Sequence, residues 1–97
     1  MVDKMLIKEV VGFEQRDWTN PRTGEKRTIK TFTLVLTNGS DSVLAEGNDE
    51  VADRMSRMPI KPETMACVSL SFHANKMERD GASRWFQRVR IENIVLI

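Results

Sequence analysis

Aromatic and basic side chains alternate near the C-terminal end of the chain. Phe86, Arg88 and Arg90 occupy every second position of the run 84–92, so in a strand they would share one face. An aromatic ring can stack on an unpaired base, and a guanidinium group can neutralise a phosphate. The pattern therefore favours a surface for single-stranded nucleic acid, and a solvated strand with one apolar residue near its edge is the alternative.

Two polar segments carry more residues of these kinds. Trp18 lies in the segment 17–27, where no strand pattern directs it inward, so its indole is a candidate for base stacking. The second segment, 74–84, separates two alternating runs, and both segments are expected to be loops. For each charged residue in them, a solvated surface position is the alternative. The basic residues predicted to contact phosphates are Arg22, Lys26, Arg27, Lys30, Lys76, Arg79 and Arg84.

Residues for catalysis or metal binding are sparse. His73 and Cys67 are the single histidine and the single cysteine, which excludes the usual N and S ligand sets. Ser71 would point the same way as His73 on a strand, but no orienting acid is in view. No paired carboxylates accompany a nucleophile or a glycine-rich phosphate loop. We therefore predict a protein that is not an enzyme and that uses no metal and no other cofactor.

Composition limits the class of protein. The chain of 97 residues is long enough for one domain with a modest core, which we place at 1–97. It is 40% hydrophobic and 30% charged, without the run of about 18 apolar residues that a membrane span needs. The opening segment lacks the features of a signal peptide, and one cysteine agrees with a reducing compartment. These features predict a cytoplasmic location and no membrane partner.

The formal net charge of +1 conceals an uneven distribution. Lys and Arg against Asp and Glu number 7 and 5 in residues 1–40, 3 and 6 in residues 41–65, and 5 and 3 in residues 66–97. The three blocks therefore carry +2, −3 and +2. If the middle block packs away from the ligand, the remaining surface is weakly attractive to a polyanion.

Five strands and one helix are expected to position these residues. Alternating and β-branched residues predict strands at 5–16, 28–37, 42–46, 65–73 and 84–92. Asn38-Gly39 predicts a hairpin that pairs the second and third strands. A helix is expected over 49–58, with Asn48 as its N-cap and an apolar stripe facing the core. Gly12 inside the first strand indicates a bulge.

Two aromatic residues and the C-terminal tail are also assigned to the core side or the surface by their strand phase. Phe72 falls in phase with the inward residues of the fourth strand, and Trp85 falls in phase with Val89 and is expected to cap the core. The tail 93–97 changes its apolar phase at Ile94, which indicates a bulge or the end of the strand. Its hydrophobicity predicts burial, either inside the fold or against another subunit.

Three antiparallel strands, a helix and two further strands make up the element order of the OB-fold, a five-stranded Greek-key barrel. We therefore predict an all-β OB-fold with one α-helix between the third and fourth strands. A different small barrel is the alternative.

Several segments also suggest a family. Gly12, the loop 18–24, the strand 32–36, the segment 60–63 and Asp80-Gly81 before 84–86 together resemble the single-stranded-DNA-binding class of bacterial and phage OB domains. The resemblance implies a barrel that binds single strands across its curved face, with 17–27 and 74–84 as flanking clamps. The chain departs from many such domains because its third strand has no aromatic residue. The compact form is also similar to small primosomal proteins, in which the barrel dimerises, so a homo-oligomer, with a dimer favoured, is expected.

Two functions of different classes follow. The first is a non-sequence-specific single-stranded DNA-binding protein for replication, recombination or transfer, with RNA as a partner that the same chemistry would accept. The alternative is an OB-fold module that binds protein or oligomerises through its apolar tail and binds no nucleic acid. The alternating Arg and Phe residues favour the first, and the near-neutral charge favours the second.

Overall fold

The structure is a computed structural model that describes residues 1–97. It is mostly β, with one short helix between the third and fourth strands, as predicted. No helix in it has the length and apolar character needed to cross a membrane. The elements are β1 (Val2–Thr19), β2 (Lys26–Thr37), β3 (Ser42–Asn48), α1 (Glu50–Ser56), β4 (Thr64–Arg79) and β5 (Ala82–Leu96).

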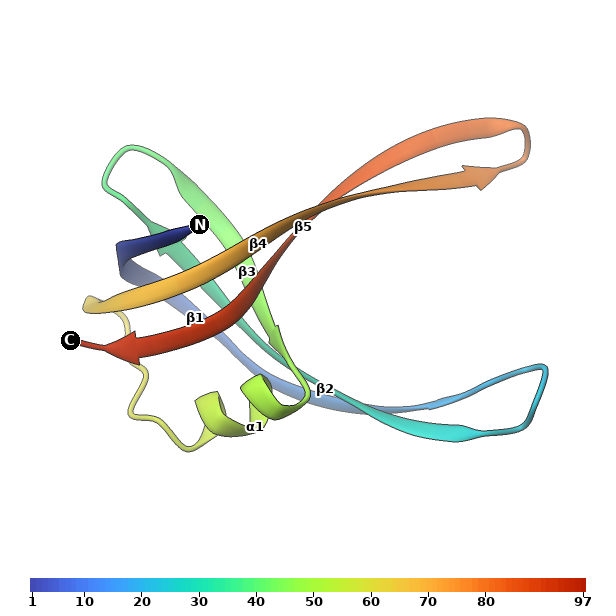
Figure 1. Ribbon diagram of the computed structural model, residues 1–97, viewed down its shortest axis with the longest axis horizontal. Helices are drawn as coiled ribbons and strands as arrows, with labels where there is room; N and C mark the ends of the chain where they lie inside the picture. The colour runs from blue at the N-terminus through green and yellow to red at the C-terminus, as the bar shows by residue number, and fades with distance from the viewer.

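The five strands form one closed sheet in the order β1-β2-β3-β5-β4, and β4 pairs back onto β1 (Figure 1). The hairpin between β2 and β3 at Asn38-Gly39 is antiparallel, as predicted. All neighbours are antiparallel except β3 and β5, which pair in parallel at Ala45 with Val89 and at Glu46 with Arg90. Closure leaves no free edge in the core region of the sheet, because each strand there has two partners.

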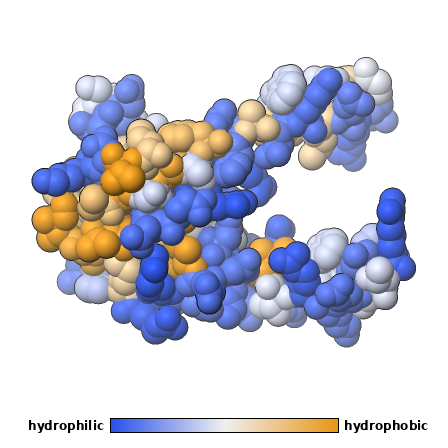
Figure 2. Space-filling view, in the orientation of Figure 1, coloured by the Kyte–Doolittle hydropathy of each residue, from blue (hydrophilic) through white to orange (hydrophobic).

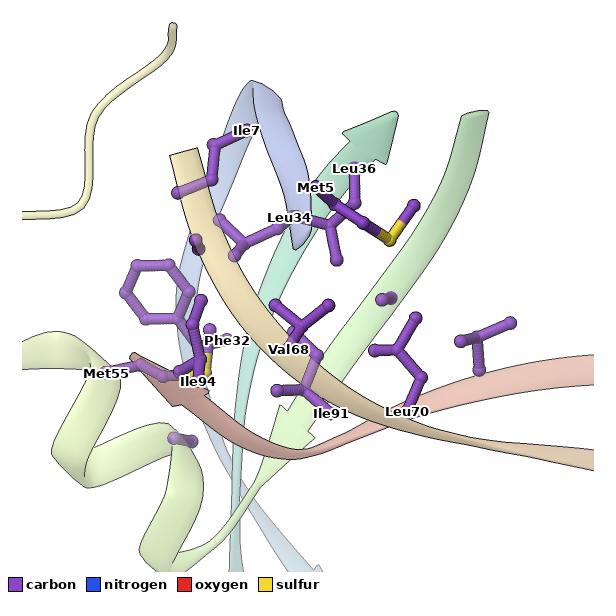
Figure 3. Packing of buried hydrophobic residues seen from close by; sticks show 14 residues of the cluster. Met5, Ile7, Phe32, Leu34, Leu36, Met55, Val68, Leu70, Ile91 and Ile94 are labelled. Atoms are coloured by element: carbon purple, nitrogen blue, oxygen red, sulfur yellow. The ribbon is translucent and has the colours of Figure 1, made fainter. Parts of the chain in front are cut away.

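The core lies inside the closed sheet and beneath α1. Side chains from all five strands and the helix gather there (Figure 3). Ala52 and Met55 fill the space from the helix side, which confirms the predicted apolar stripe. Every buried residue is apolar, so no polar side chain is buried without a hydrogen-bond partner. The largest fully buried side chains are Ile7, Leu34, Leu36, Met55, Leu70, Ile91 and Val68.

Three register shifts interrupt the pairing of the strands, two between β1 and β2 and one between β4 and β5. The register of β1 against β2 shifts between Val10 and Gly12, and Gly12 has φ 119°, which confirms the predicted bulge. In β5 the register shifts so that Asn93 pairs with Ser69 while Ile91 pairs with Leu70. The intervening extra residue moves Ile94 onto the buried face, which explains the change of apolar phase.

The tail is only partly buried within the chain itself. Ile94 is in the core, but Val95 is 56% exposed and Ile97 is 69% exposed. Alternation explains the difference, because successive side chains of a strand point to opposite faces. The outward-facing half of the tail therefore lies on the surface of the chain.

The second predicted loop is wrong, because 74–84 is mostly paired strand, and the first is only partly right, because the turn covers residues 20–25 and the rest of 17–27 is paired strand. β1 and β2 stay paired out to Thr19 and Lys26, and β4 and β5 stay paired out to Arg79 and Ala82. We call residues 14–19 with 26–31 the first arm, and residues 72–79 with 82–88 the second arm. Asp80 and Gly81 close the second arm with positive φ values of 53° and 78°, as a tight two-residue hairpin turn requires.

The second arm also corrects the placement of two aromatic residues. Phe72 is 51% exposed and Trp85 is 67% exposed, although both were expected on the core side. Both keep the predicted strand phase, but β4 and β5 have left the closed sheet at these positions. No opposite layer covers that face of the arm, so Trp85 does not cap the core.

The helix begins differently from the prediction. Asn48 is the last residue of β3, and Asp49, with φ 50°, precedes a helix of seven residues without a side-chain cap. The helix is therefore held by its packing on the sheet, because a helix this short is marginal by itself.

Gly47 provides a test of that packing. A β-carbon at this position would lie 2.7 Å from Met55 Sδ and 2.8 Å from Val51 Cγ1. Val51 is β-branched and Met55 is fully buried, so neither side chain can move away easily. We expect Gly47→Ala to lower the free energy of unfolding by about 1–3 kcal/mol, measured by urea denaturation. An unchanged midpoint would show that α1 is packed loosely on β3.

Candidate functional site

A groove separates the two arms. Both arms project from the same side of the closed sheet, and the surface between them is hollowed (Figures 1 and 2). Three adjoining hollows, the largest with a volume of about 520 Å³, share Glu46 and Arg88 in their linings. Because the same two side chains border all three, the hollows form one continuous groove.

Each part of the groove comes from a different pair of strands. The floor is formed by the neighbouring strands β2, β3 and β5, and each wall is the inner side of one arm. Floor residues are Thr33, Leu44, Ala45 and Glu46. The first wall has Glu14, Arg16, Ile29 and Thr31. The second wall has His73, Asn75, Met77, Phe86, Gln87, Arg88 and Arg90.

Strand alternation places two predicted residues on the groove face of the first arm. Arg16 pairs with Ile29, and Trp18 pairs with Arg27 in the next position of the same phase. Residues two apart on a strand share a face, so Trp18 and Arg27 continue the face on which Arg16 and Ile29 line the groove. Trp18 is 42% exposed, which leaves its ring accessible.

The second arm gathers most of the predicted basic residues. Phe86, Arg88 and Arg90 share one face, as the alternation predicted, and all three line the largest hollow. Toward the tip, Arg79 and Arg84 join Phe86 around a smaller hollow on the same face. Phe86 is 40% exposed. One face of the β4–β5 hairpin therefore carries an aromatic ring among four arginines, three from β5 and one from β4.

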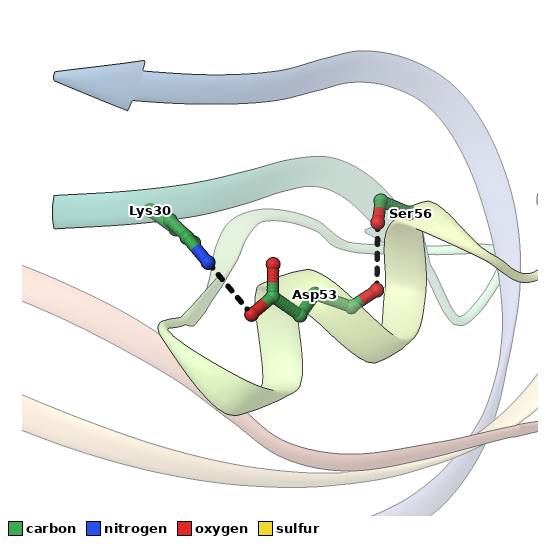
Figure 4. A network of polar contacts seen from close by, with 3 residues as sticks. All are labelled: Lys30, Asp53 and Ser56. Carbon is green, nitrogen blue, oxygen red and sulfur yellow. Dashed lines mark hydrogen bonds and ion pairs between the residues drawn. The ribbon is translucent and has the colours of Figure 1, made fainter. Parts of the chain in front are cut away.

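Lys30 lies outside this groove. Its Nζ atom is 2.9 Å from the Asp53 Oδ2 atom of α1, and this ion pair ties β2 to the helix (Figure 4). In the same turn the hydroxyl of Ser56 donates to the Asp53 carbonyl. Lys26 has the same strand phase as Lys30, so it belongs to the opposite face of the first arm.

Two further predicted residues are separate from the groove. Lys76 pairs with Trp85 on the other face of the second arm, and its Nζ atom lies 5.9 Å from the Trp85 ring centroid. The same Nζ atom is 3.4 Å from Glu78 Oε1. Arg22 lies in the exposed turn at the tip of the first arm. The ammonium group of Lys76 therefore already has an ion-pair partner and an aromatic neighbour within the arm. Arg22 has no ion-pair partner.

Sequence reasoning missed three charged residues of the groove, Glu14, Arg16 and Glu46. Arg16 is at the end of the strand predicted over 5–16, and its signal was the shared phase with Trp18. Glu46 is on β3, opposite Thr33 of β2 and Arg90 of β5. No local pattern marks Glu46, because it reaches the groove only when β3 pairs with a strand from the far end of the chain.

Charges in the groove are mixed, with arginine in excess. Glu46 Oε1 is 3.4 Å from Arg88 Nη1, and this is the one ion pair in the groove. Arg16 and Arg90 have no carboxylate partner within ion-pair distance, and neither do Arg79 and Arg84 on the second arm. These free guanidinium groups are available to an anionic ligand.

A serine and the histidine of the second wall interact with an acid, but in an unusual order. The Ser71 hydroxyl donates to Glu92 Oε1 at 2.6 Å and lies 3.0 Å from His73 Nε2. In a catalytic triad the histidine stands between the nucleophile and the acid, whereas here the serine stands in the middle. No group of three or more His, Cys, Asp or Glu residues is arranged to hold a metal ion.

Comparison with known proteins adds no relative. No protein-family model matches the chain, and no curated protein matches it. The function proposed next is therefore based on the groove, its two arms and their charges.

Proposed function

We propose that this protein is an OB-fold protein that binds single-stranded DNA, without sequence specificity, in the groove between its arms. The observation that carries the proposal is the convergence of aromatic and arginine side chains on the groove faces of both arms, chiefly Trp18 with Arg16 and Phe86 with Arg88. The strand order β1-β2-β3-β5-β4, with a helix between β3 and β4, supports the OB-fold assignment.

The bound DNA strand makes two kinds of contact with the protein. Arginines along the two arms neutralise phosphates, which fixes the path of the backbone. The rings of Trp18 and Phe86 stack on bases that cross the groove, and each stacked base contributes about 1–3 kcal/mol. Duplex DNA offers no free base faces, so we expect single strands to bind more tightly than duplex of the same length.

The cellular role follows from the ligand. A protein of this kind protects or presents exposed strands during replication, recombination or transfer. The resemblance to bacterial and phage OB domains supports a bacterial or phage origin, and a cytoplasmic location is part of this proposal. RNA offers the same stacking and phosphate contacts. Binding to RNA as well as DNA is therefore expected unless a 2′-hydroxyl is excluded sterically.

Fluorescence anisotropy with a labelled oligo-dT of about 30 nucleotides tests the proposal. With four to six phosphate contacts, the slope of log K against log salt should be roughly −3 to −4, at about −0.7 per contact. A matched duplex should bind more weakly. Absence of binding at about 50 mM salt and tens of micromolar protein would overturn the proposal.

A second candidate function, a homodimerisation module, is favoured by an apolar surface away from the groove. In the closed sheet, the outward faces of β1, β4 and β5 lie side by side, with Cys67 between Lys4 and Val95. Hydrophobic side chains gather at the end of the molecule where both termini lie (Figure 2). The apolar members of this outer face are Val2, Leu6, Met65, Cys67, Val95 and Ile97.

We propose that a second copy of the chain covers the outer face. Val2 is 72% exposed and Val95 is 56% exposed, and an apolar patch of this kind commonly marks an interface. Sedimentation velocity should show a dimer for the native chain and a monomer for Val95→Lys. Val11→Lys, at a valine that is 60% exposed outside the face, is the control. A monomeric native chain at tens of micromolar concentration would contradict this candidate.

A further inference from the structure

His73 places an imidazole on the second wall of the groove. It lines the largest hollow, and it is the only histidine of the chain. An imidazole is the side chain that ordinarily changes its charge between about pH 5 and 8, whereas carboxylates and guanidinium groups ordinarily keep theirs over that range. The charge that the groove presents to an anionic ligand therefore depends on pH through this one side chain.

Charged groups of both signs share this hollow with His73. Arg88 lies directly across from it in the register of β4 and β5, and Arg90 lines the same hollow. Glu46 of β3 also lines it, with its carboxylate paired to Arg88, and no residue of β1, β2 or α1 takes part. Two guanidinium groups and one carboxylate leave one net positive charge in the hollow. A protonated imidazole would raise that charge to two.

Hydrogen bonds determine which nitrogen of the neutral imidazole carries the proton. The Ser71 hydroxyl donates its one proton to Glu92 Oε1 at 2.6 Å, and its oxygen lies 3.0 Å from His73 Nε2. Because that proton is already given to the carboxylate, the Ser71 oxygen can only accept from the imidazole, so Nε2 carries a proton. The other ring nitrogen, Nδ1, then has a lone pair and no proton in the neutral state.

Protonation changes what Nδ1 offers to a ligand. In the neutral ring Nδ1 is an acceptor, and a phosphate oxygen is an acceptor too, so the two form no hydrogen bond. In the protonated ring Nδ1 gains an N–H group and the imidazole gains a positive charge, which together suit a phosphate. Nε2 is a donor in both states. The hydrogen bond to Ser71 can therefore hold the ring in place whether or not the ligand is bound.

We propose that His73 is a phosphate contact of the groove that operates only in its protonated state, so that single-stranded DNA binds more tightly as the pH falls. This inference rests on the proposed function, because it concerns the same groove and the same ligand. The sign follows from linkage: a ligand that binds the protonated form better has a higher affinity where that form is more populated. One added contact of this kind predicts a gain of roughly three- to tenfold between about pH 7.5 and 5.5.

The test measures binding of labelled oligo-dT by anisotropy at about pH 7.5 and 5.5, each at several salt concentrations. Thymine and the phosphodiester backbone have no group that titrates in this range, so the charge of the ligand stays constant. The variant His73→Gln keeps a polar side chain that cannot become charged. His73→Arg is the matched control, because its positive charge is permanent. Thermal melts at both pH values verify that the variants are folded.

We expect the native chain to bind roughly three- to tenfold more tightly at the lower pH, with a slope of log K against log salt that is steeper by about 0.7. The change in slope distinguishes a new phosphate contact from a structural effect of pH. Both differences should vanish in His73→Gln, and His73→Arg should bind tightly at both pH values. Equal affinities of the native chain at the two pH values would overturn this inference and leave the proposed function standing. A pH effect that persists in His73→Gln would also overturn it. No binding at either pH would reject the proposed function itself.

Discussion

The double variant Trp18→Ala, Phe86→Ala is expected to bind oligo-dT at least about 30-fold more weakly than the native chain. Each ring stacks on a base in the proposed complex, and each stack contributes about 1–3 kcal/mol. Two losses of the smaller size already give about a 30-fold change. Both rings are exposed and lie on the arms, so the fold should be unaffected. Anisotropy titration at constant salt measures the effect.

Trp85→Ala is the matched control for this double variant. Trp85 is more exposed than either stacking candidate, at 67%, but it belongs to the opposite face of the second arm, beside Lys76. Its removal should leave the affinity within about twofold, a change of about 0.4 kcal/mol. If Trp85→Ala weakened binding as strongly as the double variant, the strand would follow the other face of the arm.

The variant Leu34→Ala is expected to lower the free energy of unfolding by about 2–5 kcal/mol. Leu34 is fully buried at the centre of the closed sheet, between Val10 of β1 and Ala45 of β3. Truncation removes apolar contacts and leaves a cavity that the surrounding strands can fill only in part. Urea denaturation followed by circular dichroism measures the loss.

Leu44→Ala provides the control for stability. Leu44 is on the same hairpin but is 63% exposed on the floor of the groove. A surface substitution of this kind should change the free energy of unfolding by at most about 0.5 kcal/mol. Equal destabilisation by the two variants would contradict the assignment of Leu34 to the core and of Leu44 to the surface.

The closed part of the sheet could be predicted from the sequence because burial of one face imposes an alternating pattern. That pattern located β2 and the inward residues of β4 up to Leu70. The arms could not be found in this way, since both faces are exposed beyond Leu70 and Phe13 and no apolar alternation is required. Asp80-Gly81 was the available signal, because a two-residue turn implies that the residues on either side of it are paired.

The groove was predictable to a similar degree. Local alternation was sufficient to put Phe86, Arg88 and Arg90 on one face. Lys30 could not be excluded from the sequence, because its partner Asp53 comes from a helix 23 positions later. Glu46 was hidden for the same reason, since its contact with Arg88 spans 42 positions. Contacts between distant segments decide which charges are free.

The most direct test of the central claim is a map of the binding surface by amide chemical shifts. Oligo-dT is titrated into the isotopically labelled chain, and the residues whose signals move are placed on the structure. We expect them to cluster on the groove faces of both arms and on the floor of the groove, around Arg16, Glu46, Phe86 and Arg88. Shifts confined to the outer face of β1, β4 and β5, or no shifts at all, would contradict it.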